Sequence, residues 1–240
     1  MNKVRFCWCS SLKLRPSLPL AVAIVAHLSM RFSGINGIMY YSTALFERAN
    51  IGKNSSYATI GVGFTSILMT ILSGYLMDRA GRRTLHLIGL TGTFICSVLI
   101  TITFIFAHLA DWLKYFSITF VFAFVTFVGL GPGNVPWVIV PEIFAQGARP
   151  AATSVAMVTN WLSNFTVGLI FPLLADNIPH YVFLPFAIMT LLATLFLYKY
   201  LPETKKRTFE EITMSFRSHM RQNTKQLQSD SNNYQTLDIA

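Results

Sequence analysis

Residues 78–108 read DRAGRRTLHLIGLTGTFICSVLITITFIFAH, and the class of the fold follows from this segment. A short charged stretch ends at Arg83, and residues 84–108 then contain no Asp, Glu, Lys or Arg. About 20 consecutive apolar residues are enough for an α-helix to cross a lipid bilayer. The segment therefore predicts a membrane-spanning helix over 84–108 that follows a charged loop.

Five further apolar runs have a similar length. Of the 240 residues, 53% are hydrophobic and 12% are charged, which is outside the usual range for soluble domains. We predict an all-α membrane protein with a bundle of six transmembrane helices, near 17–46, 57–78, 84–108, 113–142, 151–174 and 181–201. The expected organisation is a cytoplasmic N-terminal segment (1–16), the bundle (17–201) and a cytoplasmic C-terminal tail (202–240).

The two longest runs, 17–46 and 113–142, exceed a simple span and contain helix-breaking residues. These are Gly34 and Gly37 in the first run, and Gly129, Gly131, Pro132, Gly133 and Pro136 in the second. Such residues let a helix break beside a cavity, where water or protein satisfies the freed backbone groups. We therefore expect both of these helices to be interrupted.

The distribution of Lys and Arg between the connections predicts the orientation. One side holds the N-terminal basic residues, Arg79, Arg82, Arg83, Arg149 and the basic residues of the tail, whereas the other holds only Arg48, Lys53 and Lys114. The side richer in Lys and Arg is normally cytoplasmic. Both termini are therefore expected in the cytosol. Asn54, in the sequon Asn54-Ser55-Ser56, is then a candidate glycosylation site in an extracellular connection.

Several classes of function lack support in the sequence. The net charge is +9, but no basic face with interleaved aromatic residues indicates nucleic-acid binding. The cysteines Cys7, Cys9 and Cys96 do not have the spacing of a zinc site. The spans contain no cluster of His, Asp and Glu and no nucleophile motif. We expect no nucleic-acid partner, no metal, no cofactor and no enzymatic activity.

Four motifs together resemble a known family. They are Ser33-Gly34-Ile35-Asn36-Gly37 with Tyr40-Tyr41-Ser42-Thr43, Asp78-Arg79-Ala80-Gly81-Arg82-Arg83, Gly131-Pro132-Gly133 through Pro136-Trp137 to Pro141-Glu142, and Pro202-Glu203-Thr204-Lys205. In this order they closely resemble the C-terminal six helices of the facilitative glucose transporters, in the sugar porter family of the major facilitator superfamily. The resemblance covers residues 15 to about 212. It implies half of a major facilitator fold, with the substrate held between this bundle and an N-terminal one.

The resemblance also implies a sugar-binding site. In it Asn36 contacts the sugar, Trp137 stacks against the sugar ring, and Asn160 and Trp161 lie near the cavity. Tyr40 and Tyr41 match an extracellular gate, and Ser66 stands where the family has an asparagine. Amide side chains suit sugar hydroxyls because both groups donate and accept hydrogen bonds.

A second set of residues is implied to form a salt-bridge cluster at the cytoplasmic face. Such pairs would close that end of the transporter and separate when it opens inward. The set consists of Asp78, Arg79, Arg82, Arg83, Glu142, Arg149, Glu203 and Arg207.

The chain departs from the family pattern at several positions. Met30 and Arg31 stand where the family has two consecutive glutamines, and Gly129 replaces an acid. A charged side chain near the middle of a membrane is costly unless it faces water or a partner. Arg31 has three interpretations: pairing with an N-terminal half, binding of an anionic or differently shaped substrate, or a lesion in the gene.

Two hypotheses about function remain. In the first, the chain is the C-terminal half of a plasma-membrane transporter that moves glucose or another hexose by facilitated diffusion and alternating access. Its partners are then the hexose, the lipid bilayer and an N-terminal six-helix half. In the second, it is a non-transporting fragment that binds or regulates related full-length transporters. An in-frame six-helix segment immediately upstream in the gene would favour the first.

Overall fold

The computed structural model describes residues 17–48, 55–106 and 113–205, together with 207, 211, 212, 214 and 216. Within these residues the elements are α2 (Ser17–Phe32), α3 (Ile35–Arg48), α4 (Ser55–Ala80), α5 (Arg82–Phe106), α6 (Leu113–Leu130), α7 (Val135–Ile143), α8 (Arg149–Asn177), the 3₁₀ helix η2 (Pro179–Tyr181) and α9 (Phe183–Tyr200). No strand occurs in these ranges.

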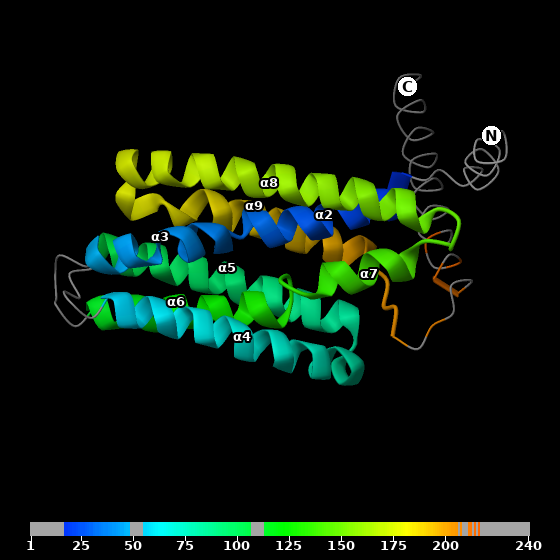
Figure 1. Ribbon diagram of the computed structural model, residues 1–240, viewed down its shortest axis with the longest axis horizontal. Helices are drawn as coiled ribbons and strands as arrows, with labels where there is room; N and C mark the ends of the chain where they lie inside the picture. Colours follow the sequence, from blue (N-terminus) through cyan, green and yellow to red (C-terminus); the bar gives the residue numbers. More distant parts are fainter. Residues whose placement is uncertain are drawn as a thin grey trace, which may run out of the picture.

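The helices form six spans that are long and apolar enough to cross a membrane. They are Leu18–Tyr41, Ser55–Ala80, Arg82–Phe106, Tyr115–Ile143, Arg149–Asn177 and Phe183–Tyr200. The spans run side by side, and the start of α2 and the end of α9 lie at the same end of the bundle, on the right in Figure 1. The prediction of a six-helix membrane bundle is confirmed, with boundaries that differ by a few residues. The chain is therefore a multi-pass integral membrane protein.

The first span is broken between α2 and α3, as the sequence predicts. Gly34 has a φ of +90°, a backbone conformation that glycine adopts readily because it has no Cβ. The Ser33 hydroxyl donates a hydrogen bond to the Met30 carbonyl at 2.7 Å and satisfies one freed acceptor. Asn36 follows directly after the break, so its side chain enters the middle of the bundle at the start of a new helix.

The fourth span is broken between α6 and α7, again as predicted. The Ser73 hydroxyl from α4 donates to the Leu130 carbonyl at 2.6 Å, and the Asn134 amide donates to the Gly129 carbonyl at 2.9 Å. Side chains of the protein thus replace the helical bonds that end here, as non-helical backbone at membrane depth requires. Gly131 lies against Gly89 of α5, and a Cβ on Gly89 would be 2.7 Å from the Gly131 Cα.

Two apolar cores hold the spans together. The first is rich in aromatic rings and joins α3, α4, α5, α6, α8 and α9. The ring centroid of Phe183 lies 6.2 Å from that of Phe124 and 6.1 Å from that of Phe171. The second lies toward the end where α2 begins and includes Val22, Ile139 and Leu197. The breaks at Gly34 and Gly131 therefore interrupt helices that are fixed on both sides by packing.

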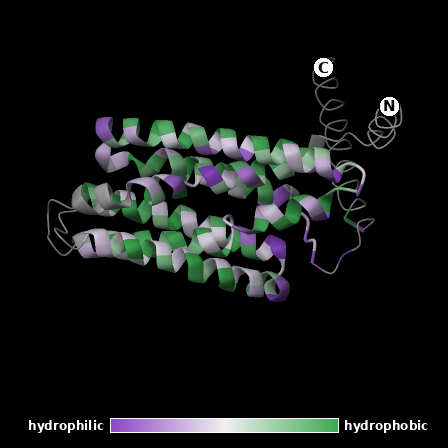
Figure 2. Cartoon of the chain, in the orientation of Figure 1, coloured by the Kyte–Doolittle hydropathy of each residue, from purple (hydrophilic) through white to green (hydrophobic). Residues whose placement is uncertain are grey.

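The outer surface is largely apolar, as expected of a protein dissolved in lipid. Helices α4 and α8 carry many exposed large apolar side chains, among them Ile60, Ile71, Phe165 and Leu173. Figure 2 shows hydrophilic positions (purple) gathered toward the end that holds the α4–α5 connection, with a few others halfway along the bundle. The positions halfway along the bundle mark the place to look for a ligand site.

Candidate functional site

A network of polar side chains crosses the middle of the bundle. Arg31 Nε donates to Asn160 Oδ1, and Arg31 Nη1 donates to Asn36 Oδ1 at 3.0 Å. Asn36 Nδ2 in turn donates to Asn164 Oδ1 at 2.6 Å. One charged and three amide side chains from α2, α3 and α8 are therefore linked. We call Arg31, Asn36, Asn160 and Asn164 the amide network.

The position of each member follows from its helix. Arg31 lies in the last turn of α2, where a cation interacts favourably with the helix dipole. Asn160 and Asn164 are four residues apart on α8 and therefore lie on one face of that helix. Asn160 is fully buried, Asn36 is 6% exposed and Arg31 is half-buried. The network thus reaches from the interior of the bundle toward its surface.

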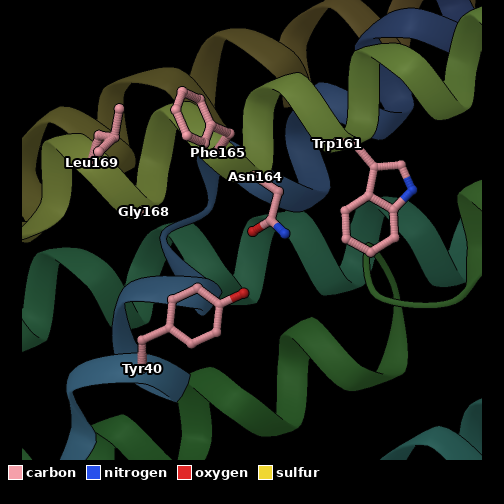
Figure 3. A pocket seen from close by; sticks show the side chains of 6 residues that line it. All are labelled: Tyr40, Trp161, Asn164, Phe165, Gly168 and Leu169. Carbon is pink, nitrogen blue, oxygen red and sulfur yellow. The ribbon is translucent and has the colours of Figure 1, made fainter.

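An open pocket of about 380 Å³ adjoins the network. Figure 3 shows Tyr40 from α3 and Asn164 from α8 pointing toward one another across it, with Trp161 at one side. Phe165, Gly168 and Leu169 complete the lining. The volume is at the lower end of the range of small-molecule sites, and the mixture of aromatic rings with one amide is typical of them.

Trp137 lies apart from this pocket, on α7 directly after the break. It is half-buried, and its ring contacts His27 of α2 edge-on, with ring centroids 4.9 Å apart and planes at 82°. His27 Nδ1 is buried without a hydrogen-bond partner among the described residues. The broken helix therefore presents its indole beside a second polar ring inside the bundle.

The structure brings some of the predicted sugar-site residues together and separates others. Asn36 and Asn160 share the amide network, and Tyr40 and Trp161 line the pocket beside it. Tyr41 instead stacks on Phe171, with centroids 5.5 Å apart, and so faces the aromatic core. Ser66 lies on α4 and Trp137 lies on α7. Neither helix contributes a side chain to the amide network or to the lining of this pocket.

Two residues of this region, Asn164 and His27, have no role in the site predicted from the sequence. Asn164 lies four residues from Asn160, which is a signal in the sequence for a shared helix face. One interpretation of Arg31 from the sequence is pairing with an N-terminal half, whereas its hydrogen-bond partners in the structure, Asn160 and Asn36, come from this same chain. His27 had no signal in the sequence that distinguished it from a core histidine.

The charged residues at the other predicted site meet at the end where α2 begins. Arg82 Nη2 lies 3.3 Å from Asp78 Oδ1, and Arg82 Nε lies 3.3 Å from Glu142 Oε1. The Thr204 hydroxyl donates to Glu142 Oε2 at 2.5 Å. Arg82 thus joins α4, α5 and α7, while Thr204 connects the segment after α9 to the same carboxylate.

Glu203 holds the connection between α4 and α5. Its Oε1 accepts the backbone N–H groups of Arg82, Thr204 and Lys205, each at 3.0 Å. Arg82 begins α5, so the carboxylate also lies at a helix N-terminus, where negative charge is stabilised. Gly81 has a φ of +95°, and a Cβ there would lie 2.7 Å from Glu203 Oε2. Glycine is thus required both for the turn and for the approach of Glu203.

The remaining residues predicted for this cluster contact other groups. Arg83 Nη2 donates to the Tyr198 carbonyl at 2.7 Å, and Arg79 lies over the Tyr75 ring at 4.9 Å. Arg149 and Arg207 are exposed. Within the described part of the chain none of these four arginines pairs with a carboxylate. The candidate glycosylation site Asn54 lies outside the described residues.

Comparison with known proteins gives a consistent result. The model of the family "Sugar (and other) transporter" matches residues 6–216. Over 199 residues the chain is 47% identical to facilitated glucose transporter member 1 of solute carrier family 2 from Gallus gallus, and 46% identical to member 4 from Mus musculus. Each alignment covers 83% of this chain but only 40% and 39% of the relative, so the chain spans about two fifths of their length.

Solved structures of a sugar symporter share the fold. The proton:xylose symporter XylE, bound to 6-bromo-6-deoxy-D-glucose, matches with a TM-score of 0.71 and 26% identity, covering 82% of this chain and 42% of XylE. The inward-open structure of the xylose transporter XylE from E. coli also matches with a TM-score of 0.71 and covers 85% of this chain. The six-helix bundle is thus similar to a part of a major facilitator superfamily protein.

Proposed function

The chain belongs to the Sugar (and other) transporter family, and on that basis we propose that it transports a hexose across the plasma membrane as one half of a transporter. The other half would be a second six-helix bundle, supplied by an N-terminal partner. The two bundles would rock about a site between them and expose it to each side in turn. Membership of this family is the main support for the proposal, because the family model matches residues 6–216.

The amide network supports a sugar as the substrate. An amide that is left without hydrogen bonds inside an apolar bundle costs roughly several kcal/mol of free energy. Sugar hydroxyls donate and accept, so they match amide groups, which do both. The network adjoins a pocket with aromatic side chains, and the half-buried Trp137 would provide a further flat surface for a sugar ring.

The cluster around Arg82 supports a closing contact at one end of the bundle. Arg82 is only 17% exposed and pairs with Asp78 and Glu142, which belong to different helices. Ion pairs between elements that move apart are a common means of holding one state of a two-state protein. We propose that these pairs are intact when this end is closed and separate when it opens.

We further propose that this end is cytoplasmic, because Lys and Arg collect there. Arg79, Arg82, Arg83, Arg149 and Lys199 all lie at this end of the described helices. An epitope tag on the C-terminus is therefore expected to be protected from protease in intact cells and cleaved after permeabilisation. A tag that is cleaved in intact cells would reverse the orientation. The same assay on an N-terminal tag provides the control, since six spans place both termini on one side.

Transport is tested by expressing the chain with and without the missing N-terminal half. In cells without hexose transporters, this chain alone is expected to insert into the membrane but to give no saturable uptake of labelled glucose. Co-expression with the N-terminal half of a related glucose transporter is expected to restore uptake, because alternating access needs two bundles around one site. Membrane levels of the chain, measured from the tag, must be equal in both conditions.

The outcomes separate the proposal from its alternative. Saturable uptake by the chain alone would overturn the half-transporter reading and indicate a functional homo-oligomer. If co-expression gives no uptake, and the chain instead lowers the uptake of a full-length relative, the non-transporting regulatory fragment is favoured.

A further inference from the structure

We propose that Arg31 makes the binding site selective for a hexose derivative that carries a carboxylate, such as a sugar acid, over the neutral hexose. The inference rests on the proposed function, since it concerns the substrate class of the same site. A guanidinium is held in the middle of a membrane bundle, where a cation is costly unless it faces water or a partner.

Arg31 has no counter-ion among the residues that the structure describes. Its recorded partners are the neutral amide oxygens of Asn160 and Asn36, and the face of Trp161 at 5.8 Å from Arg31 Cζ. Ion pairs in the described part of the chain involve Arg82 and its two acids, at the end of the bundle. The site therefore carries one positive charge that its own side chains leave unbalanced.

The guanidinium also retains donors for a ligand. An arginine side chain has five N–H groups, and its planar fork matches a carboxylate with two parallel hydrogen bonds. Arg31 uses one N–H on Asn160 and one on Asn36. The side chain is half-buried rather than fully enclosed. A carboxylate that binds there would gain a charge-assisted pair and neutralise the cation.

A neutral hexose is expected to bind less favourably at this site. The amide oxygens that would accept its hydroxyl groups, Asn36 Oδ1 and Asn160 Oδ1, each already accept one hydrogen bond from Arg31 and keep one free lone pair. A hydroxyl that binds at the second lone pair does nothing to balance the charge of Arg31, and one that displaces Arg31 takes an acceptor from a cation that has no counter-ion in the described bundle. Removing the partners of a partly buried charge is unfavourable. The same side chain therefore discriminates against the neutral sugar.

The neighbouring groups suit the rest of a sugar acid. Asn160 Nδ2 is fully buried with no hydrogen-bond partner in the described ranges, so a donor within the network remains unused. Tyr40, Trp161 and Asn164 line the adjoining pocket with one phenol, one indole and one amide. These groups can contact the hydroxyls and the ring of a ligand whose carboxylate pairs with Arg31.

The test uses this chain assembled with the N-terminal half of a related glucose transporter. Uptake of labelled glucuronate and labelled glucose is compared for the wild type, Arg31→Gln and Lys199→Gln. The wild type is expected to take up glucuronate about tenfold better than glucose, consistent with one charge-assisted contact of about 1.4 kcal/mol. In Arg31→Gln the preference is expected to reverse, because glutamine removes the charge and offers both a donor and an acceptor to hydroxyl groups.

Lys199→Gln is the matched control, since it also removes one positive charge but lies exposed at the end of α9. It should keep the wild-type preference. Arg31→Lys, which keeps the charge without the fork, should retain preference for the acid but with weaker uptake. Folding of each variant is checked by its membrane level and by a single symmetric peak in size-exclusion chromatography.

The outcomes distinguish this inference from the proposed function. If the wild type takes up glucose as well as Arg31→Gln does and does not take up glucuronate, Arg31 is not a selector and only this inference fails. If no variant takes up either sugar while membrane levels are normal, the proposed function fails, and this inference fails with it.

Discussion

In the Gly89→Ala variant the bundle is expected to lose about 3 kcal/mol of stability, because a methyl group has no space at this position. A Cβ on Gly89 would lie 2.6 Å from Pro132 Cδ, 2.7 Å from Gly131 Cα and 2.9 Å from the Phe127 carbonyl oxygen. Two of these atoms belong to backbone and the third to a rigid ring. None can move aside by a side-chain rotation, so α5 and the α6–α7 break must separate.

Gly74→Ala is the matched control for this substitution. Gly74 is also in the interior of a helix, α4, but nothing lies within 4 Å of the Cβ position. Alanine there should be neutral or should stabilise the helix by up to about 1 kcal/mol, because glycine has the lower helix propensity. Thermal unfolding of the two purified variants in detergent measures the difference. If Gly89→Ala unfolds at the wild-type temperature, the close contact between α5 and the α6–α7 break is wrong.

Replacing Trp137 by alanine is expected to weaken hexose uptake by the assembled transporter about 30-fold. Truncating an aromatic anchor in a binding site costs about 2 kcal/mol, and about 1.4 kcal/mol corresponds to a factor of ten. Trp137→Phe should keep part of the affinity, because a smaller ring still offers an apolar face. The concentration dependence of uptake gives the values for both variants.

A packing role for Trp137 predicts a different pattern. Trp137 contacts His27 edge-on, so its loss removes a contact within the protein whether or not a sugar binds. If alanine and phenylalanine are tolerated equally at unaltered expression, Trp137 is a packing residue and not a platform. Phe106→Ala, at an exposed aromatic residue near the end of α5, is the control and should change uptake less than twofold.

The spans and their breaks were predictable from the sequence because each depends on local chemistry. Long apolar runs set the helices, and the glycines around Gly34 and Gly131 set the interruptions. The family resemblance implies a place at one gate for both tyrosines. Successive residues of an α-helix point about 100° apart, however, so Tyr40 and Tyr41 face different surroundings. Tyr40 lines the pocket, while Tyr41 stacks on Phe171 in the core.

The amide network was not predictable in the same way. The bond from Arg31 to Asn160 joins α2 to α8, and nothing in the sequence fixes how the faces of two distant helices meet. The charged cluster was also only partly predictable from the sequence. Its motif groups four charges around the connection between α4 and α5, but the structure pairs Arg82 with acids while Arg83 contacts the Tyr198 carbonyl. Sequence proximity brought these residues to one end of the bundle without deciding their partners.

The break between α6 and α7 has a consequence for biosynthesis. Helix α7 has nine residues, which at 1.5 Å per residue is a length of about 14 Å, while the hydrocarbon layer is roughly 30 Å thick. It cannot be recognised by the insertion machinery as a span of its own. Helix α6 has 18 residues and is long enough to enter the lipid first, so α7 is expected to follow only as its continuation. A ribosome pause between Leu130 and Asn134 would leave the Gly129 carbonyl without the Asn134 amide, whereas Ser73 of α4, which is synthesised earlier, can already donate to the Leu130 carbonyl.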